Sequence, residues 1–392
     1  METNIKYFII IFSVTLMAVL GIASVSPALP GIAEHFNLAD EDFGLIISVF
    51  AIPGILLTPV LGFLSDKFGR KIVIVPALLL FGVAGFMCSV AETFEMLLFF
   101  RFLQGVGAAS LGALNVALIG DIFAGPDRPR IMGYNHSVLS IGTATFPIIG
   151  GILSGISYEY VFYMPLVAIP IAIYVLFFLD LDVKGKSHQT RLYFSSFLKL
   201  IKNRNLLTLL IVSISLFIIL MGPFITYVPY VAKERFALEP TFIGIILASI
   251  SISTSLTAYF LGKFLKRFQH ESLLKIGLLG YGLALGMIPL YNEWYMLFIS
   301  TAIFGISHSF VLPNSQSMII KFSDENNRAL LMSFNRMLSQ VGQALGPVLS
   351  GAVFVYFSDG IGVDGIYIVS VVFAVSILTI FSFFYNKPEE LA

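Results

Sequence analysis

Long apolar runs separated by short polar breaks recur along the whole chain of 392 residues. Each run is about 20 residues long, which is the length that a helix needs to cross the hydrocarbon core of a bilayer. The first run is longer than the apolar core of a signal peptide and lacks a clean cleavage site, so we expect it to be retained. The pattern predicts twelve membrane spans at 7–29, 43–64, 72–90, 96–120, 131–155, 160–180, 207–229, 241–261, 273–290, 294–320, 329–354 and 364–385.

Basic residues are distributed unevenly over the breaks between these runs. If the N-terminus is inside, 19 of the 23 Lys and Arg residues fall in the breaks after even-numbered spans or in the tails, and the outer loops hold only Lys233 and Arg235. Cytoplasmic loops carry the excess of Lys and Arg, so this count predicts that both termini are cytoplasmic. The longest break, 183–204, is predicted to link a bundle over 1–182 to a bundle over 205–392. It is either an amphipathic helix on the inner membrane surface or a solvated tether.

The two halves of the chain resemble each other at an offset of 200 residues. Residues 128–151 and 328–351 are identical at seven of 24 aligned positions, whereas composition alone gives roughly two. Six spans repeated in the same orientation predict an all-α membrane protein built from two pseudo-symmetric six-helix bundles. Parallel repeats of this kind are typical of transporters, with the substrate site between the bundles.

Composition excludes several classes of protein. The chain is 57% hydrophobic and 12% charged, which is too little charge for a soluble protein of this length. Its 23 basic and 23 acidic residues balance, so no nucleic-acid partner is expected. One cysteine and five scattered histidines give no metal-ligand spacing, and no nucleotide-binding loop or Ser-His-Asp set is present. We therefore expect neither an enzyme nor an ATP-driven pump, and no cofactor or metal.

Three short stretches carry a resemblance to a known family. GFLSDKFGRK (62–71), RFLQGVG (101–107) and GTATFPIIGG (142–151) are similar to signature sequences of the major facilitator superfamily, in the loop between spans 2 and 3 and in spans 4 and 5. SPALPGIA, at the outer end of span 1, is similar to a segment of the twelve-span drug:proton antiporter branch. The resemblance covers essentially the whole chain. It implies the fold of that superfamily and a monomeric transporter in the plasma (inner) membrane.

The first of these stretches suggests a gate. Gly62 is expected to let two helices approach closely, and Gly69 to permit a tight turn. Asp66 and Arg70 are four residues apart and share one face if the helix continues, while Asp121 closes span 4 on the same side. The family resemblance implies that these three charged residues latch the inner ends of spans 2 and 4. The alternative is a solvated basic loop.

The second stretch places a cation in a span. If Arg101 is buried it needs a partner, and Gln104 lies on the same face of the helix. The family resemblance implies that Arg101 takes part in proton coupling. The alternative is that its side chain snorkels to the outer membrane interface. Every acidic residue falls at the end of a predicted span or in a loop. The other coupling candidates are therefore Glu34 at the mouth of span 1, His136 in span 5 and His308 in span 10, each of which is otherwise a packing residue.

The third stretch resembles an antiporter signature with one departure. Phe146 stands where the family usually has glycine, which weakens the antiporter interpretation, although the copy in span 11 keeps the Gly–Pro pair. The residues predicted to kink and closely pack spans 5 and 11 are Gly142, Pro147, Gly150, Gly151, Gly346 and Pro347.

Polar residues within the spans are few. The substrate-cavity candidates are Gln104, Asn115, Asn135, Tyr227, Asn314, Gln316, Arg336, Gln340 and Gln343. An apolar pocket with few polar anchors suits hydrophobic or amphipathic cargo. The sequence therefore predicts proton-coupled, multidrug-type efflux of small molecules by alternating access. The alternatives are an exporter of one metabolite, such as a sugar or siderophore, and a non-transporting receptor or scaffold.

Overall fold

The computed structural model describes residues 2–40, 42–125, 127–180, 203–322 and 328–385. Within these residues, twelve helical segments are long and apolar enough to cross a membrane. The predicted all-α fold with twelve spans is confirmed. The linker predicted at 183–204, with its amphipathic helix, lies almost entirely outside the described residues.

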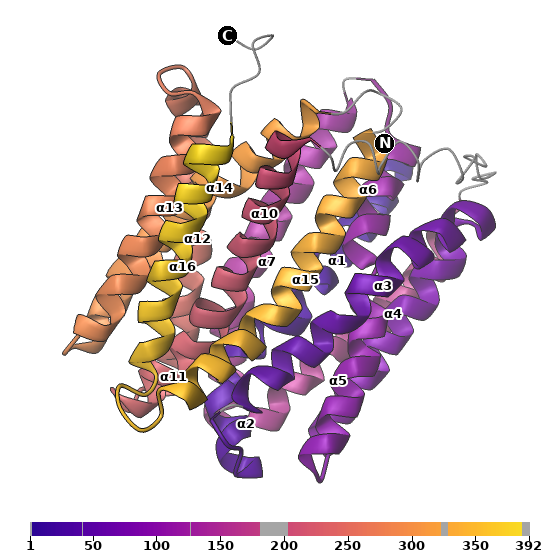
Figure 1. Cartoon of the computed structure of the whole chain (residues 1–392). Coiled ribbons are helices and arrows are strands. Elements are labelled where there is room, and N and C mark those ends of the chain that lie inside the picture. Colours follow the sequence, from indigo (N-terminus) through magenta and orange to yellow (C-terminus); the bar gives the residue numbers. More distant parts are fainter. Residues whose placement is uncertain (1, 41, 126, 181–202, 323–327, 386–392) are drawn as a thin grey trace. The chain divides into compact units, whose positions relative to one another are not determined.

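The helices of the first half follow the predicted spans closely. They are α1 (Glu2–Ala23), η1 (Ser26–Ala28), α2 (Leu29–Phe36), η2 (Asp42–Gly44), α3 (Leu45–Phe68), α4 (Arg70–Met87), η3 (Cys88–Val90), α5 (Phe94–Ala108), α6 (Leu111–Ile122), α7 (Asp127–Ile156), η4 (Tyr158–Val167) and α8 (Ala168–Phe178). Span 1 is thus α1 with its extension α2, and span 4 is α5 followed by α6. The helices α3, α4 and α5 run alongside one another (Figure 1).

The second half repeats this order. Its elements are α10 (Arg204–Ile219), η5 (Leu220–Thr226), α11 (Tyr227–Glu234), α12 (Pro240–Leu265), α13 (His270–Met287), η6 (Ile288–Leu290), η7 (Trp294–Met296), α14 (Leu297–Ile320), α15 (Arg328–Tyr356) and α16 (Asp364–Phe384). Helix α13 packs against both α14 and α16, and α10 packs along α15.

Contacts divide the chain into two compact units. The first contains α1 to α8 together with Lys233–Ala248, and the second contains the rest of the second half, including α12 from Ser249 onward. The start of α12 joins the first unit because it meets α7 at backbone distance: a methyl group at Gly151 would overlap Pro240, and one at Gly244 would overlap Pro147. The division by contacts therefore differs at this point from the division of the sequence into halves.

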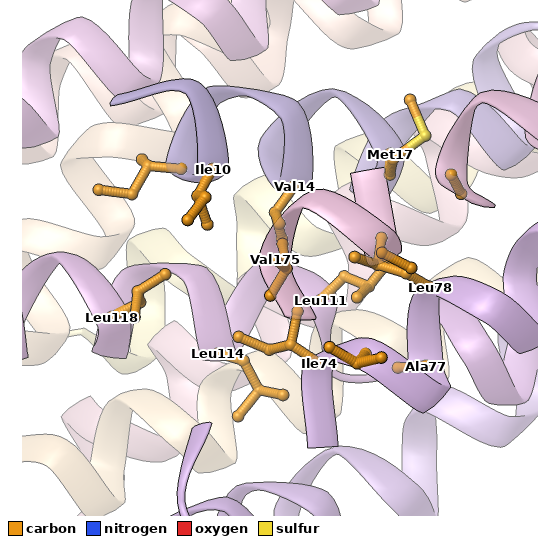
Figure 2. Packing of buried hydrophobic residues seen from close by; sticks show 14 of the residues in the cluster. Ile10, Val14, Met17, Ile74, Ala77, Leu78, Leu111, Leu114, Leu118 and Val175 are labelled. Carbon is orange, nitrogen blue, oxygen red and sulfur yellow. The ribbon is translucent and has the colours of Figure 1, made fainter. Parts of the chain in front are cut away.

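The core of the first unit is apolar and centres on α1. Figure 2 shows side chains of α1, α4, α6 and α8 packed together, among them Ile10, Ile74, Leu118 and Val175, all of which are fully buried. Removing one such side chain leaves a cavity that costs about 2–5 kcal/mol. These four helices therefore form a fixed frame, against which α3, α5 and α7 place their polar groups.

The first helix of each half is interrupted at an equivalent place. Span 1 changes from α-helix to a short 3₁₀ segment, η1, with Pro27 near its start. Span 7 changes instead to a π-helix, η5, which contains Pro223. The Thr226 hydroxyl donates a 2.7 Å hydrogen bond to the Met221 carbonyl within this segment.

Candidate functional site

The chain turns sharply between α3 and α4 at one residue, Gly69. Its φ of 101° and ψ of 150° lie in a region that side-chain-bearing residues rarely adopt. Helix α3 ends at Phe68, and α4 begins at Arg70. Asp66 and Arg70 therefore do not share one continuous helical face, as the sequence interpretation supposed. They belong to two helices and meet because the glycine redirects the chain.

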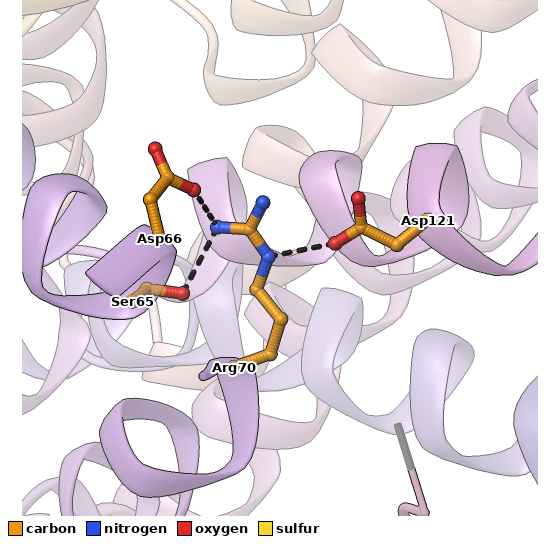
Figure 3. A network of polar contacts seen from close by, with 4 residues as sticks. All are labelled: Ser65, Asp66, Arg70 and Asp121. Atoms are coloured by element: carbon orange, nitrogen blue, oxygen red, sulfur yellow. Dashed lines mark hydrogen bonds and ion pairs between the residues drawn. The ribbon is translucent and has the colours of Figure 1, made fainter. Parts of the chain in front are cut away.

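This turn brings Arg70 among three oxygen-bearing side chains, which together form the Arg70 cluster (Figure 3). The Arg70 Nη1 donates to Asp66 Oδ1 at 2.5 Å and to Ser65 Oγ at 3.0 Å. The Arg70 Nε donates to Asp121 Oδ2 at 2.8 Å. The guanidinium thus joins the ends of α3, α4 and α6, and Ser65 is a member that the sequence interpretation missed.

The two carboxylates of the Arg70 cluster differ in exposure. The side chain of Arg70 is 10% exposed, that of Asp121 is 26% exposed and that of Asp66 is 57% exposed. Water screens an exposed ion pair, which contributes only about 0–1 kcal/mol, and screens a less accessible pair less. The contact between Arg70 and Asp121 is therefore the stronger of the two, although the sequence drew attention first to Asp66.

The close helix approach expected at Gly62 is absent. A methyl group built there would have no heavy atom within 4 Å. Helix α5 approaches its neighbours closely at two other glycines. Gly105 packs against the Phe50 backbone of α3, and a methyl group added at Gly107 would lie 2.5 Å from the Phe81 nitrogen of α4. Glycine is thus required nearer the middle of the spans than the family signature suggests.

Arg101 of α5 is buried in the interior of the first unit, with no exposed surface. It donates hydrogen bonds to the Gly21 carbonyl of α1 at 3.0 Å, to the Ile46 carbonyl of α3 at 3.2 Å and to Gln104 Oε1 at 2.7 Å. Its guanidinium lies 4.3 Å from the centre of the Phe50 ring. Snorkelling to the membrane surface, the alternative left open by the sequence, is therefore excluded.

The charge of Arg101 is stabilised without a counter-ion. No described carboxylate pairs with it, and carbonyl dipoles with an aromatic face take that place. The Nη2 of Arg101 and the Nε2 of Gln104 have no partner within the described part of the chain. The arrangement ties α1, α3 and α5 together and leaves two buried donors facing the same region. A part in proton coupling stays a prediction.

A second buried polar group joins α1, α6 and α7, and we call it the Thr15 triad. Thr15 donates to Asn135 Oδ1 at 2.5 Å, and Asn115 Nδ2 lies 2.5 Å from Thr15 Oγ1 and 3.3 Å from Asn135 Oδ1. All three side chains are buried. Asn115 and Asn135 were predicted as cavity-lining residues, but here they bind each other across three helices. Thr15 was missed.

The other coupling candidates lie apart from one another. His308 is buried in the second unit, where its Nδ1 lies 2.9 Å from the Tyr281 hydroxyl and its ring stacks on Phe304. His136 of α7 and Glu34 of α2 are exposed. The contacts of His308 are those of a packing residue, which was the alternative interpretation for it.

The predicted cavity residues fall into two groups. One group is buried within the units; for example, Asn314 Oδ1 lies 2.5 Å from His270 Nδ1, and the Tyr227 ring stacks 6.3 Å from Phe354. These residues contact other side chains or backbone groups inside their unit, whereas the sequence predicted that they line a cavity. The buried group is Gln104, Asn115, Asn135, Tyr227 and Asn314. The partly or well exposed group is Gln316, Arg336, Gln340 and Gln343.

The glycines of α7 and α15 serve close packing. Helix α7 continues through Pro147 without a break. A methyl group at Gly150 would overlap the Ser24 backbone, one at Gly142 would lie 2.9 Å from a Leu16 methyl, and one at Gly346 would lie 2.6 Å from the Ile218 carbonyl. Helix α15 likewise continues through Pro347. The predicted packing role fits these contacts, whereas neither proline ends its helix.

Alignment of the two halves at the offset of 200 residues could have indicated some of the polar residues that the sequence analysis missed. Thr15 aligns with Ser215 and His270 aligns with Arg70, so a polar residue in one copy marks a candidate in the other. Ser65 and Tyr281 align with Leu265 and Phe81 and give no such signal. Only the folded chain shows their contacts.

Known proteins match the chain over nearly its whole length. The family model described as Major Facilitator Superfamily matches residues 11–239 and 224–392. The chain belongs to the major facilitator superfamily. Membership of this superfamily indicates a multi-pass membrane transporter rather than an enzyme, and confirms the family that the three signature stretches resembled.

Two curated relatives of this superfamily are exporters or resistance proteins by name. The chain is 26% identical over 382 residues to the "Quinolone resistance protein NorA" of Staphylococcus aureus (strain COL), covering 93% of this chain and 96% of the relative. It is 26% identical over 365 residues to the "Bacillibactin exporter" of Bacillus subtilis (strain 168), covering 89% and 90%.

Solved structures of the superfamily share the fold. The nucleoside transporter NupG superposes with a TM-score of 0.81 at 17% identity, covering 99% of this chain and 100% of that one. A bacterial homologue of the human lysosomal transporter Spinster also gives 0.81, at 18% identity, covering 98% and 96%. At this identity the likeness concerns the fold alone.

Proposed function

We propose that this superfamily member is a proton-coupled exporter of small hydrophobic or amphipathic compounds. It acts in the plasma membrane, with both termini in the cytoplasm, by alternating access. The similarity to a quinolone resistance protein over 93% of the chain supports multidrug-type cargo. The excess of basic residues in alternate loops supports the orientation.

The packing of α7 is the observation that carries the proposal. At Gly150 this helix meets the backbone of Ser24, just after α1, and at Gly151 it meets the backbone at the start of α12, with no room for a methyl group at either position. A contact this close excludes water and therefore protons. A proton-driven exporter needs such a seal, because a leak would dissipate the gradient without moving cargo. The sequence of this segment resembles the antiporter signature for the same stretch.

The Arg70 cluster gives the transporter a switchable contact. Its ion pairs join α3, α4 and α6 at one end of the first unit. A partly exposed network of this kind favours the conformation in which the three ends lie together and is broken at modest cost when they separate. In the proposed cycle the cluster stabilises the outward-open state.

A proton carrier is the remaining part. Every acidic residue of the twelve spans lies within two residues of a span end. The proposed carrier therefore involves Arg101 with its hydrogen-bonded neighbour Gln104, or one of the exposed groups His136 and Glu34.

Export of one specific metabolite is the second candidate function. The similarity to a bacillibactin exporter over 89% of the chain favours a siderophore in particular. The two candidates differ in breadth: a multidrug exporter moves unrelated dyes, whereas a specific exporter moves one class of compound. A receptor or scaffold, in contrast, moves neither.

Everted membrane vesicles with defined amounts of the protein test the proposal. We expect energised vesicles to accumulate an amphipathic dye and to lose it when a protonophore is added. Gly151→Ala should abolish this accumulation, whereas Gly155→Ala is the matched control, because a methyl group there meets only Thr241 Oγ1 at 3.5 Å. Accumulation equal to that of empty vesicles, across dyes and siderophores, would refute export.

A further inference from the structure

Helix α15 carries one face of polar side chains inside a membrane span, which we call the α15 polar stripe. It consists of Arg336, Gln340 and Gln343, spaced four and three residues apart in the span Leu331–Tyr356. At about 100° per residue these three side chains lie within roughly 60° of one another. They extend from about 8 Å to about 18 Å beyond the start of the span, at about 1.5 Å per residue.

The stripe lies opposite an exposed, largely apolar side of α15. Leu345 lies about 180° around the helix from Arg336, and it is exposed, as are Leu349 and Tyr356 on the same side. A third face packs against α10 through Asn335, Gly342 and Gly346. The exposed apolar side and the side packed on α10 therefore account for two directions around α15. The stripe occupies the third. A cation within a span takes that direction when it is lined by water.

The stripe is free to bind a ligand. Arg336 is exposed, and Gln340 and Gln343 are partly exposed. Within the residues that the structure describes, none of the three has a hydrogen bond or an ion pair. Arg101, the other arginine well inside a span, is fully buried and bonded to two carbonyls and an amide. Of these two arginines, Arg336 is thus the one that is available to a ligand.

No acid within the described spans neutralises this charge. The acidic residues of the twelve spans all lie within two residues of a span end, and none of them pairs with Arg336. A guanidinium offers two parallel donors that match a carboxylate, and the two glutamines add donors and acceptors one and two turns further along the helix.

We propose that the cargo is an amphipathic acid, whose carboxylate binds Arg336 while polar groups on its apolar body bind Gln340 and Gln343. This inference rests on the proposed export function and names the chemical class of its cargo. It distinguishes the protein from an exporter of cationic dyes, because a fixed positive charge repels a cation and binds an anion.

Binding to the purified full-length chain in phosphatidylcholine nanodiscs tests the inference without requiring transport. The probes are 2-naphthoate, its uncharged analogue 2-naphthamide, and a naphthyl trimethylammonium ion. We expect naphthoate to bind the wild type at least tenfold more tightly than either analogue, a factor of ten being about 1.4 kcal/mol. Arg336→Gln should remove this preference, Arg336→Lys should retain part of it, and Arg336→Glu should reverse it towards the ammonium ion.

Lys263→Glu is the matched control, because it changes the net charge equally at an exposed residue of α12. Its preference should equal that of the wild type, and the unliganded melting temperature of each variant shows that it is folded. Equal binding of naphthoate by the wild type and Arg336→Gln would overturn the inference. Loss of the preference when phosphatidylglycerol replaces phosphatidylcholine would assign Arg336 to a lipid headgroup and would also overturn it. If naphthoate binds as expected but energised vesicles export nothing, the function fails and the acid site stands.

Discussion

The two halves of the chain hold equivalent helix starts, those of α4 and α13, in place with different side-chain contacts. Where α4 begins, Arg70 binds two carboxylates and a hydroxyl; where α13 begins, the equivalent residue is His270, which binds the Asn314 amide. We call the second arrangement the His270 pair. The positions equivalent to Ser65, Asp66 and Asp121 are Leu265, Lys266 and Lys321, so no acid remains to form an ion pair.

The turn differs in the same way. One residue, Gly69, joins α3 to α4, whereas four residues, 266–269, join α12 to α13. Gln269 precedes α13 with an ordinary φ of −73°. Helix packing at this end therefore needs neither the glycine nor the charges. Their presence in the first half alone points to a functional demand. Four sets of variants distinguish a functional role of these residues from a structural one.

Arg70→Gln should have the largest effect. It removes the cation from two carboxylates and leaves them unpaired, and hydrogen bonds to charged groups contribute about 1.5–3 kcal/mol. We expect dye export in energised vesicles to fall about tenfold or more, with unchanged protein in the membrane. Arg70→Lys should be intermediate, because lysine cannot bridge both acids with a planar fork. Full activity of Arg70→Gln would reduce the cluster to a solvated basic loop.

Gly69→Gln should come next, because it imposes a side chain on a φ of 101°. Strain of this kind costs about 1–3 kcal/mol. The thermal midpoint of the purified protein should fall, and export should fall with it. The exchanged variant, Gln269→Gly, is the control and should change the stability by less than about 1 kcal/mol. Equal losses in the two variants would contradict the difference between the turns.

The two carboxylates can be ranked by the same vesicle assay. Asp121 is 26% exposed and Asp66 is 57% exposed, so water screens the Asp66 pair more. We expect Asp121→Asn to lower export about fivefold, equivalent to about 1 kcal/mol, and Asp66→Asn to lower it about twofold. The reverse order would show that Asp66 acts in a conformation where it is less exposed.

His270→Gln should have the smallest effect. A neutral hydrogen bond contributes about 1 kcal/mol, and glutamine can still reach an amide. Export should change by less than about twofold, and the thermal midpoint should shift only slightly. A loss comparable to that of Arg70→Gln would mean that the His270 pair is a second latch, and the contrast between the halves would then disappear.

The sequence predicted the spans and the Arg70 cluster for identifiable reasons. Membrane spans have a strict length and composition, so the twelve apolar runs were visible without any structural information. Arg70 and Asp66 were visible because four charges within ten residues are rare beside a bilayer. The family signature then connected Asp121, which lies more than 50 residues away, to the same end of the bundle.

The sequence could not predict contacts that depend on how helices rotate. Gly62 looked like a close-packing residue, yet it faces open space, and Gly105 takes that role. Asn115 looked like a lining residue, yet its partner Thr15 lies 100 residues away on another helix. Helical spacing assigns residues to a common face but does not say which neighbour that face meets.

The interruptions of the first helix in each half have a consequence for the lifetimes of backbone hydrogen bonds. At η1 the 3₁₀ turn, and at η5 the π turn, replace the regular α-helical ladder in the middle of an apolar segment. Both geometries hold their amides less well than the flanking turns. In deuterated water the backbone amides of these two stretches should take up label before those of the flanking helical turns.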